Sequence, residues 1–213
     1  MEFRNKKSLG QNFLIDKNIL IKIVKTLKIC KEDKLLEIGP GTGNLTKYLI
    51  DLRPKYIKVV EKDNQLVKIL KDKFDDKIDI INDDILNLKE DFYEDNIIIF
   101  GNLPYNISTK ILAKWCLSKN IKFKKLILMF QKEVADRIVA KVNTNEYSRI
   151  TILANWRFSV SKVFDINSNC FFPKPKINST LLEFTPKKKL IKIKNPKNIE
   201  YITKIFFNQR RKM

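Results

Sequence analysis

Short runs of apolar residues alternate along the chain with stretches in which apolar residues recur every three or four positions. The apolar runs predict buried strands at residues 34–38, 56–60, 77–81, 97–100 and 125–130. The intervening stretches predict amphipathic helices over residues 43–52, 64–74 and 108–117. Ser108 is a candidate N-cap for the last of these helices. This alternation predicts an α/β fold with a mostly parallel central sheet that is flanked by helices on both faces.

The second half of the chain shows a different pattern. Residues 148–166 and 178–184 read as longer strands on either side of the loop "NSNCFFPKPKI" at residues 167–177. A basic connector follows, and residues 199–213 begin like a helix. No internal repeat is evident.

Composition narrows the classes of function. The chain has 213 residues, of which 44% are hydrophobic, enough for one good-sized domain or for one domain with a small appendage. It contains no histidine, and its three cysteines are dispersed, which disfavours a metal site or a disulfide framework. No apolar run approaches the roughly 20 residues of a membrane span. The first residues lack an apolar signal core, so we expect a cytoplasmic protein that does not contact membranes.

Charge is distributed unevenly along the chain, whose formal net charge is +19. Residues 31–100 carry 12 Lys and Arg against 16 Asp and Glu, a net charge of −4, whereas residues 1–30, 101–150 and 151–213 carry +5, +7 and +11. A lysine-rich composition alone would not produce this arrangement. Basic segments around an acidic one favour a polyanionic partner such as nucleic acid.

A glycine-rich loop follows the first predicted strand in the sequence "EIGPGTGNL". Gly39, Gly41 and Gly43 let the backbone turn sharply and approach a ligand closely at the start of a helix. The dinucleotide-binding fingerprint would require a glycine at Asn44, so this loop has a different spacing, with Glu37 two residues before its first glycine.

Two further acids follow the next two strands. Glu61 ends the second strand, where a carboxylate can accept hydrogen bonds from both hydroxyls of a ribose. Asp84 follows the third strand and could accept a hydrogen bond from an adenine amino group. Each acid alone could be a solvated loop residue, but together they lie where open α/β sheets bind ligands. The set suits S-adenosylmethionine (AdoMet), a nucleoside with no phosphate and with a cationic tail.

The sequence "IIIFGNLPYNIST" places an amide, a proline and an aromatic residue directly after the fourth strand. Asn102 and the carbonyl of Leu103 could accept hydrogen bonds from the exocyclic amine of a base and localise its lone pair on nitrogen. Pro104 stiffens the turn, and Tyr105 offers a face for a flipped-out base. The amine loses its proton after it attacks the methyl group, so no histidine is needed. The alternative is a plain strand-to-helix turn with an aromatic plug.

The segments "LGQNFLID", "EIGPGTGNLT", "FGNLPYNIST", "QKEVADRI" and "FFPKPKINS" together resemble the ribosomal-RNA adenine N6,N6-dimethyltransferases from about residue 6 to about residue 212. This resemblance implies a Rossmann-like, class I AdoMet-dependent fold. It implies AdoMet contacts at Asn12, Leu14, Gly39, Glu61, Asp84 and Asn102, to which the glycine loop adds Gly41. It also implies that Phe171 closes on the target base opposite Tyr105. Phe172 is the neighbouring candidate, but the spacing of Pro173 and Pro175 favours Phe171.

Within this family, "GPG" and "NLPY", followed by "QKEVADRI" and "FNQRRK", resemble the bacterial small-subunit (16S) branch more than the large-subunit enzymes. That branch dimethylates two adjacent adenines in the hairpin near the 3′ end of small-subunit rRNA, late in ribosome assembly. We therefore expect an enzyme that acts as a monomer on the immature small subunit, with AdoMet and no metal.

Family members carry a small helical domain after the catalytic one, and "FFNQRRK" normally opens it. We expect residues 1–187 to form the catalytic domain, and residues 188–213 to form a basic connector and the first helix of a truncated C-terminal domain. The truncation would be either a removal or a short natural form.

Three other functions stay open at this stage. The first is an assembly checkpoint that binds immature small subunits with weak or lost activity, and the second is methylation of large-subunit rRNA. The third, methylation of DNA adenine or protein glutamine, is disfavoured by "FGNLPYNIST" and by the "FxPxPK" loop.

Overall fold

Within residues 11–26, 28–191 and 193–208, which the computed structural model describes, seven strands form one sheet in the order β4-β3-β2-β5-β6-β9-β7. The strands of this sheet are β2 (Lys34–Ile38), β3 (Tyr56–Val60), β4 (Asp79–Ile81), β5 (Ile97–Asn102), β6 (Phe123–Gln131), β7 (Phe158–Ile166) and β9 (Ser179–Pro186). The short strands β1 (Phe13–Leu14) and β8 (Phe171–Phe172) pair separately with each other. The helices are α1 (Lys17–Thr26), α2 (Asn44–Asp51), α3 (Asn64–Phe74), α4 (Ser108–Leu117), α5 (Lys132–Ile138), α6 (Arg149–Arg157) and α7 (Lys197–Asn208).

Pairing within the sheet changes direction between its two halves. Strands β4, β3, β2, β5 and β6 run parallel, whereas β9 lies antiparallel to both β6 and β7. Parallel neighbours need crossover connections, and helices supply them between β2 and β3, between β3 and β4 and between β5 and β6. The carboxyl ends of β2, β3 and β5 consequently meet at one edge of the sheet.

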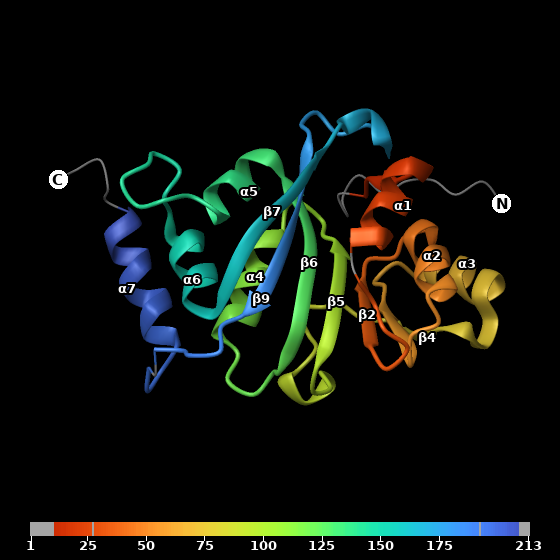
Figure 1. Cartoon of the computed structure of the whole chain (residues 1–213), viewed down its shortest axis with the longest axis horizontal. Helices are drawn as coiled ribbons and strands as arrows, with labels where there is room; N and C mark the ends of the chain where they lie inside the picture. Colours follow the sequence, from red (N-terminus) through yellow and green to blue (C-terminus); the bar gives the residue numbers. More distant parts are fainter. Residues whose placement is uncertain (1–10, 27, 192, 209–213) are drawn as a thin grey trace.

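The apolar strands are buried on both faces, as their near-continuous hydrophobic runs predict. In β5, Ile97 and Ile99 belong to one buried cluster and Ile98 and Phe100 to the other. Helices α1, α2 and α3 cover the face that carries Phe100, and α4, α5 and α6 cover the opposite face. The result is a three-layer α/β arrangement. Figure 1 shows α1, α2 and α3 at one end of the molecule and α5, α6 and α7 at the other.

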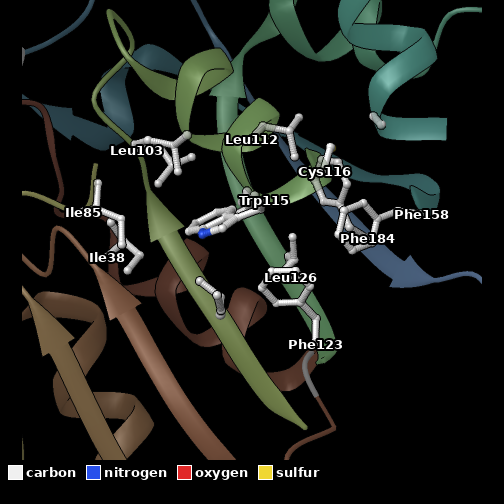
Figure 2. Close-up of a cluster of buried hydrophobic side chains, with 14 of the residues drawn as sticks. Ile38, Ile85, Leu103, Leu112, Trp115, Cys116, Phe123, Leu126, Phe158 and Phe184 are labelled. Atoms are coloured by element: carbon white, nitrogen blue, oxygen red, sulfur yellow. The ribbon is translucent and has the colours of Figure 1, made fainter. Parts of the chain in front are cut away.

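Trp115 of α4 lies at the centre of the cluster beneath α4, α5 and α6. Its side chain is fully buried, and its indole N–H donates a hydrogen bond of 3.1 Å to the hydroxyl of Tyr93. Figure 2 shows Leu103, from the turn after β5, directed into the same cluster as Trp115. The core therefore anchors the segment that follows β5.

Helix α7 packs against α6 at the end of the described chain. Glu200 forms an ion pair of 2.5 Å with Arg149, and Ile199 packs against the cluster that contains Trp115. The predicted boundary after residue 187 lies between β9 and α7, where the described residues 187–191 and 193–196 form no helix or strand, and it stays a prediction. Within the described ranges, no helix combines the length and the apolar character that a bilayer crossing requires.

The predicted parallel strands and the helices over residues 64–74 and 108–117 are confirmed. Two predictions were wrong. Residues 148–166 are not one long strand, because α6 occupies the first half and β7 the second. Ser108 does not cap α4: the N-cap residue is Ile107, and the buried Ser108 hydroxyl donates a hydrogen bond of 3.2 Å to the carbonyl of Tyr105.

Candidate active site

A cavity of about 210 Å³ opens at the edge where the carboxyl ends of β2, β3 and β5 meet. In open α/β sheets this edge is the usual place for a ligand. Most of the residues predicted from the sequence line this one cavity: Asn12, Gly39, Gly41, Glu61, Asp84, Asn102, Leu103, Pro104 and Tyr105. Leu14 and Phe171 do not line it.

The glycine loop connects β2 to α2 and lets two other elements approach closely. Gly41 and Gly43 have φ angles of 61° and 76°, a region that residues with a Cβ atom rarely adopt. A Cβ atom on Gly41 would lie 2.5 Å from the ring of Phe13, and one on Gly43 would lie 2.3 Å from the ring of Phe74. Only glycine therefore fits at positions 41 and 43, where β1 and α3 pack against the loop.

Glu61 lies at the end of β3 with 7% of its surface exposed. Its carboxylate accepts hydrogen bonds from the backbone N–H groups of Asp63 at 2.9 Å and Gly41 at 3.3 Å. Burial raises the pKa of Glu61, and these hydrogen bonds oppose the rise. Each oxygen keeps a further lone pair, so the carboxylate can also accept from the hydroxyls of a ribose.

Asp84 lies in the loop after β4 and lines the same cavity. One oxygen accepts from the backbone N–H of Leu86, and the other pairs with Lys62, both at 2.9 Å. Burial raises the pKa of Asp84, but these two interactions outweigh it and hold the pKa below its ordinary value. Lys114 of α4 fixes this loop further by donating to its backbone carbonyls, including that of Leu86 at 2.8 Å. The loop therefore presents an ionised carboxylate.

Asn102 ends β5, and its side-chain nitrogen donates a hydrogen bond of 2.7 Å to the backbone carbonyl of Asn12. This contact fixes the rotation of the amide, so its oxygen is the atom left to accept from a ligand. Leu103 is 1% exposed, and it approaches Gly101 so closely that a Cβ atom there would lie 2.6 Å from it. The core therefore holds the backbone at Leu103 in place.

Pro104 and Tyr105 complete the turn into α4. The carbonyl of Pro104 accepts from the N–H of Ile107 at 3.0 Å. The half-buried Tyr105 shares a hydrogen bond of 2.6 Å with the hydroxyl of Ser179 at the start of β9. Burial raises the pKa of the Tyr105 phenol, and the bond to Ser179 opposes the rise. Tyr105 is thus a neutral aromatic ring that is held at the cavity.

Phe171 and Leu14 do not line this cavity, and their predicted contacts with the target base and with AdoMet stay predictions. They are cross-strand partners in the β1–β8 pair, and their exposed fractions are 2% and 5%. Both belong to the cluster beneath α1, α2 and α3. The motif could not reveal this, because Phe171 and Phe172 are adjacent aromatic residues and the pairing with β1 decides which one is buried. Phe172 is 61% exposed.

Two features of the site were not assigned from the sequence. Glu37, 3% exposed, accepts a hydrogen bond of 2.6 Å from the hydroxyl of Thr46 and thereby ties β2 to α2. Burial raises the pKa of Glu37 to about 7. The hydrogen bond from Thr46 lowers this pKa, and the negative charge of Glu61 raises it further. Lys62, next to Glu61 in the chain, lines the cavity and pairs with Asp84. Its position next to Glu61 in the sequence could have identified Lys62 as a site residue.

Across the described ranges, no group of three or more His, Cys, Asp or Glu side chains is arranged to hold a metal ion. The cavity instead combines backbone at a tight glycine turn, two carboxylates at successive strand ends and an amide beside an aromatic ring. These groups fit a nucleoside with a cationic tail. A mostly parallel sheet with this site defines a class I AdoMet-dependent methyltransferase.

Comparison with known proteins gives the family. A family model described as ribosomal RNA adenine dimethylase matches residues 2–213, and the chain belongs to this family. A ribosomal RNA small subunit methyltransferase A from Pelagibacter ubique (strain HTCC1062) is 55% identical over 216 residues, which cover 100% of this chain and 82% of the relative. The protein of the same name from Malacoplasma penetrans (strain HF-2) is 43% identical, with 99% of this chain and 76% of the relative covered.

Solved structures agree with this result. A dimethyladenosine transferase from Plasmodium falciparum superposes with a TM-score of 0.75 at 33% identity, with 83% of this chain and 64% of that one covered. The 23S rRNA methyltransferase ErmE gives a TM-score of 0.73 at 26% identity, with 92% of this chain and 79% of that one covered. The fold is thus shared with a dimethyladenosine transferase and with a 23S rRNA methyltransferase, whereas the sequence relatives at 55% and 43% identity are named as small-subunit enzymes.

Proposed function

We propose that the protein transfers methyl groups from AdoMet to N6 of two adjacent adenines in the 3′-terminal hairpin of small-subunit (16S) rRNA, giving N6,N6-dimethyladenine during ribosome assembly. The observation that carries the proposal is the turn after β5. There an amide fixed by the Asn12 carbonyl stands beside an aromatic ring, at a cavity lined by two carboxylates. The small-subunit relatives at 55% and 43% identity support the choice of substrate.

The cofactor half of the cavity is formed by the glycine loop, Glu61 and Asp84. AdoMet supplies a methyl group that is activated by bonding to a sulfonium. Glu61 would accept hydrogen bonds from the ribose hydroxyls of the cofactor, and Asp84 would accept one from its adenine amino group. Because Gly41 has no side chain, the ring of Phe13, which also lines the cavity, can lie against the loop.

The substrate half is formed by residues 102–105. The lone pair of an exocyclic adenine amine is delocalised into the ring, so the amine is a weak nucleophile. The Asn102 side-chain oxygen and the Leu103 carbonyl accept its hydrogens and draw the nitrogen towards tetrahedral geometry. Tyr105 stacks on the flipped-out base and excludes water. Holding the amine in line with the methyl group provides most of the catalysis.

The reaction needs no strong base in the protein. Methyl transfer makes the amine cationic, and its proton is then released to water. The absence of histidine from the chain is compatible with this sequence of events. For the second methylation of the same adenine, the monomethylated amine has one hydrogen left, which is shared between the two acceptors at the turn.

The test replaces Asn102 with alanine. We expect transfer of tritiated methyl groups to undermethylated small subunits to slow by about 10²- to 10³-fold, the range found when one positioned hydrogen-bonding group is removed from a reacting centre. We expect AdoMet affinity, measured by calorimetry, to change less than tenfold. Asn106→Ala is the matched control, because this exposed asparagine lines the same cavity just beyond the turn.

Equal losses of methyl transfer and AdoMet affinity in Asn102→Ala would contradict the amine-binding role. Small subunits that are bound by the wild-type protein but receive no methyl group would favour the assembly checkpoint. Transfer to large-subunit RNA instead would favour the large-subunit branch. The position of the new methyl groups, read by mass spectrometry of the digested RNA, distinguishes N6 from every other acceptor.

We extend the proposal to the partner and to the organisation of the chain. The protein acts as a monomer on the immature small subunit in the cytoplasm, where bacterial ribosomes assemble. Residues 1–187 form the catalytic domain, and residues 188–213 form a connector and the first helix of a C-terminal helical domain. This boundary is supported by residues 187–191 and 193–196, the described part of the segment between β9 and α7, which form no helix or strand.

A further inference from the structure

The β1–β8 pair divides its four side chains between two environments. Leu14 lies opposite Phe171, and both are buried in the core. Phe13 lies opposite Phe172, so these two rings share the other face of the pair. Phe13 lines the cavity, and the Cβ atoms of directly opposed residues lie about 4.5–5.5 Å apart. Phe172, 61% exposed, therefore stands at the rim of the active site.

The segment that carries Phe172 is held at both ends. The N–H of Ile15 donates to the carbonyl of Cys170 at 2.8 Å, which ties the segment to the start of α1. At its other end, the side-chain oxygen of Asn178 accepts from the N–H of Ser168 at 3.0 Å, and the Asn178 carbonyl accepts from the N–H of Lys132 at 2.9 Å. The exposed ring is thus presented on a fixed support.

Two lysines follow this ring closely in the chain. Lys174 and Lys176 follow Phe172 at alternate positions, and both are exposed. Neither forms a salt bridge within the part of the chain that the structure describes. An exposed aromatic ring with adjacent free lysines is the combination that binds single-stranded nucleic acid, since the ring stacks on a base and the ammonium groups neutralise phosphates.

We propose that Phe172, Lys174 and Lys176 form a platform for single-stranded RNA at the rim of the cavity. Phe172 stacks on a nucleobase next to the one that enters the cavity, and the two lysines contact the phosphates that follow. The inference rests on the proposed function, because it names the form of RNA that the same site accepts. A continuous duplex offers no free base face, so the platform selects RNA whose strand is open beside the target.

The test measures binding of a fluorescein-labelled ten-nucleotide oligoadenylate by anisotropy, with the full chain and AdoMet present. We expect Phe172→Ala to weaken binding by about 5- to 150-fold, the range that loss of one stacked base gives, and Phe172→Tyr to retain it. The double variant Lys174→Ala/Lys176→Ala should reduce the slope of log K against log salt by about 1.4, since each phosphate contact on a single strand contributes about 0.7.

A matched control separates this platform from general positive charge. Lys188 and Lys189 are also exposed and adjacent, but they follow the opposite end of β9, about 25 Å away for an eight-residue strand. Lys188→Ala/Lys189→Ala removes the same charge and should change oligoadenylate binding less than twofold. AdoMet affinity and the thermal midpoint of each variant report whether the fold is intact, and both should match the wild type.

Three outcomes would overturn the proposal. Equal effects of the two lysine pairs would show that only overall charge matters. Unchanged oligoadenylate binding in an intact Phe172→Ala variant would exclude stacking. If the variants bind oligoadenylate as the wild type does but methylate small subunits more slowly, the rim residues contact a ribosomal protein and not RNA. Failure of the proposed function is recognised separately, because the wild-type protein would then transfer no methyl group whatever the binding results.

Discussion

Replacing Glu37 with glutamine tests the electrostatics beneath the glycine loop. The Glu37 carboxyl is buried at the end of β2, and burial raises its pKa from the ordinary 4.5 to about 7, with the Thr46 bond opposing the rise and the Glu61 charge adding to it. Glutamine has nearly the same shape and keeps an oxygen to accept the Thr46 hydrogen bond. The substitution therefore removes the ionisation while retaining the contact.

The magnitude follows from linkage between protonation and folding. Below pH 4.5 Glu37 is protonated in both the folded and the unfolded protein. Between pH 4.5 and about 7 the unfolded chain releases this proton and the folded protein keeps it, so the free energy of unfolding falls as pH rises. The interval between 4.5 and about 7, at 1.36 kcal/mol for each pH unit, gives a loss of about 3 kcal/mol.

The assay is urea unfolding of wild type and Glu37→Gln from pH 4.5 to 8.5. We expect the variant to gain stability relative to wild type as pH rises, and the difference to level off near 3 kcal/mol above pH 7. Glu32→Gln, at an exposed position just before β2, is the control and should show no such trend. Parallel curves for wild type and Glu37→Gln would refute the reasoning, because they would mean that Glu37 titrates alike in both states.

The remaining predictions concern the β1–β8 pair and the cofactor carboxylates. Phe171→Ala should lower the free energy of unfolding in urea by about 3–5 kcal/mol, as large core truncations do, while Phe172→Ala should change it by less than about 0.5 kcal/mol. Equal effects would contradict the described register. Asp84→Asn should weaken AdoMet binding in calorimetry by about tenfold or more, since hydrogen bonds to charged groups contribute about 1.5–3 kcal/mol. Lys62→Met should weaken AdoMet binding less than about fivefold, because the Lys62–Asp84 ion pair is partly exposed. A larger loss of AdoMet affinity in Lys62→Met than in Asp84→Asn would make Lys62 the cofactor contact.

The parallel half of the fold was predictable from the chain alone. Strands β2 and β3 and helices α3 and α4 have the predicted bounds, because their apolar residues follow local periodicity and their ends carry turn residues. The secondary structure of residues 148–166 was harder to predict, since β-branched and aromatic residues there suggested a strand. Burial of Leu153 and Ala154 beneath α4 decided in favour of helix α6 for the first half, which is a tertiary effect.

The same division holds for the site. Sequence by itself determined the glycine turn, Glu61, Asp84 and the turn at residues 102–105, because the chemistry of each is local and the parallel topology brings strand ends together. The hydrogen bond from Asn102 to Asn12 spans 90 residues, and no local pattern encodes it. Likewise, only the pairing of β8 with β1 decided that Phe171 enters the core and Phe172 faces solvent. Periodicity records which residues are apolar, whereas the packing of distant segments decides which side chains meet.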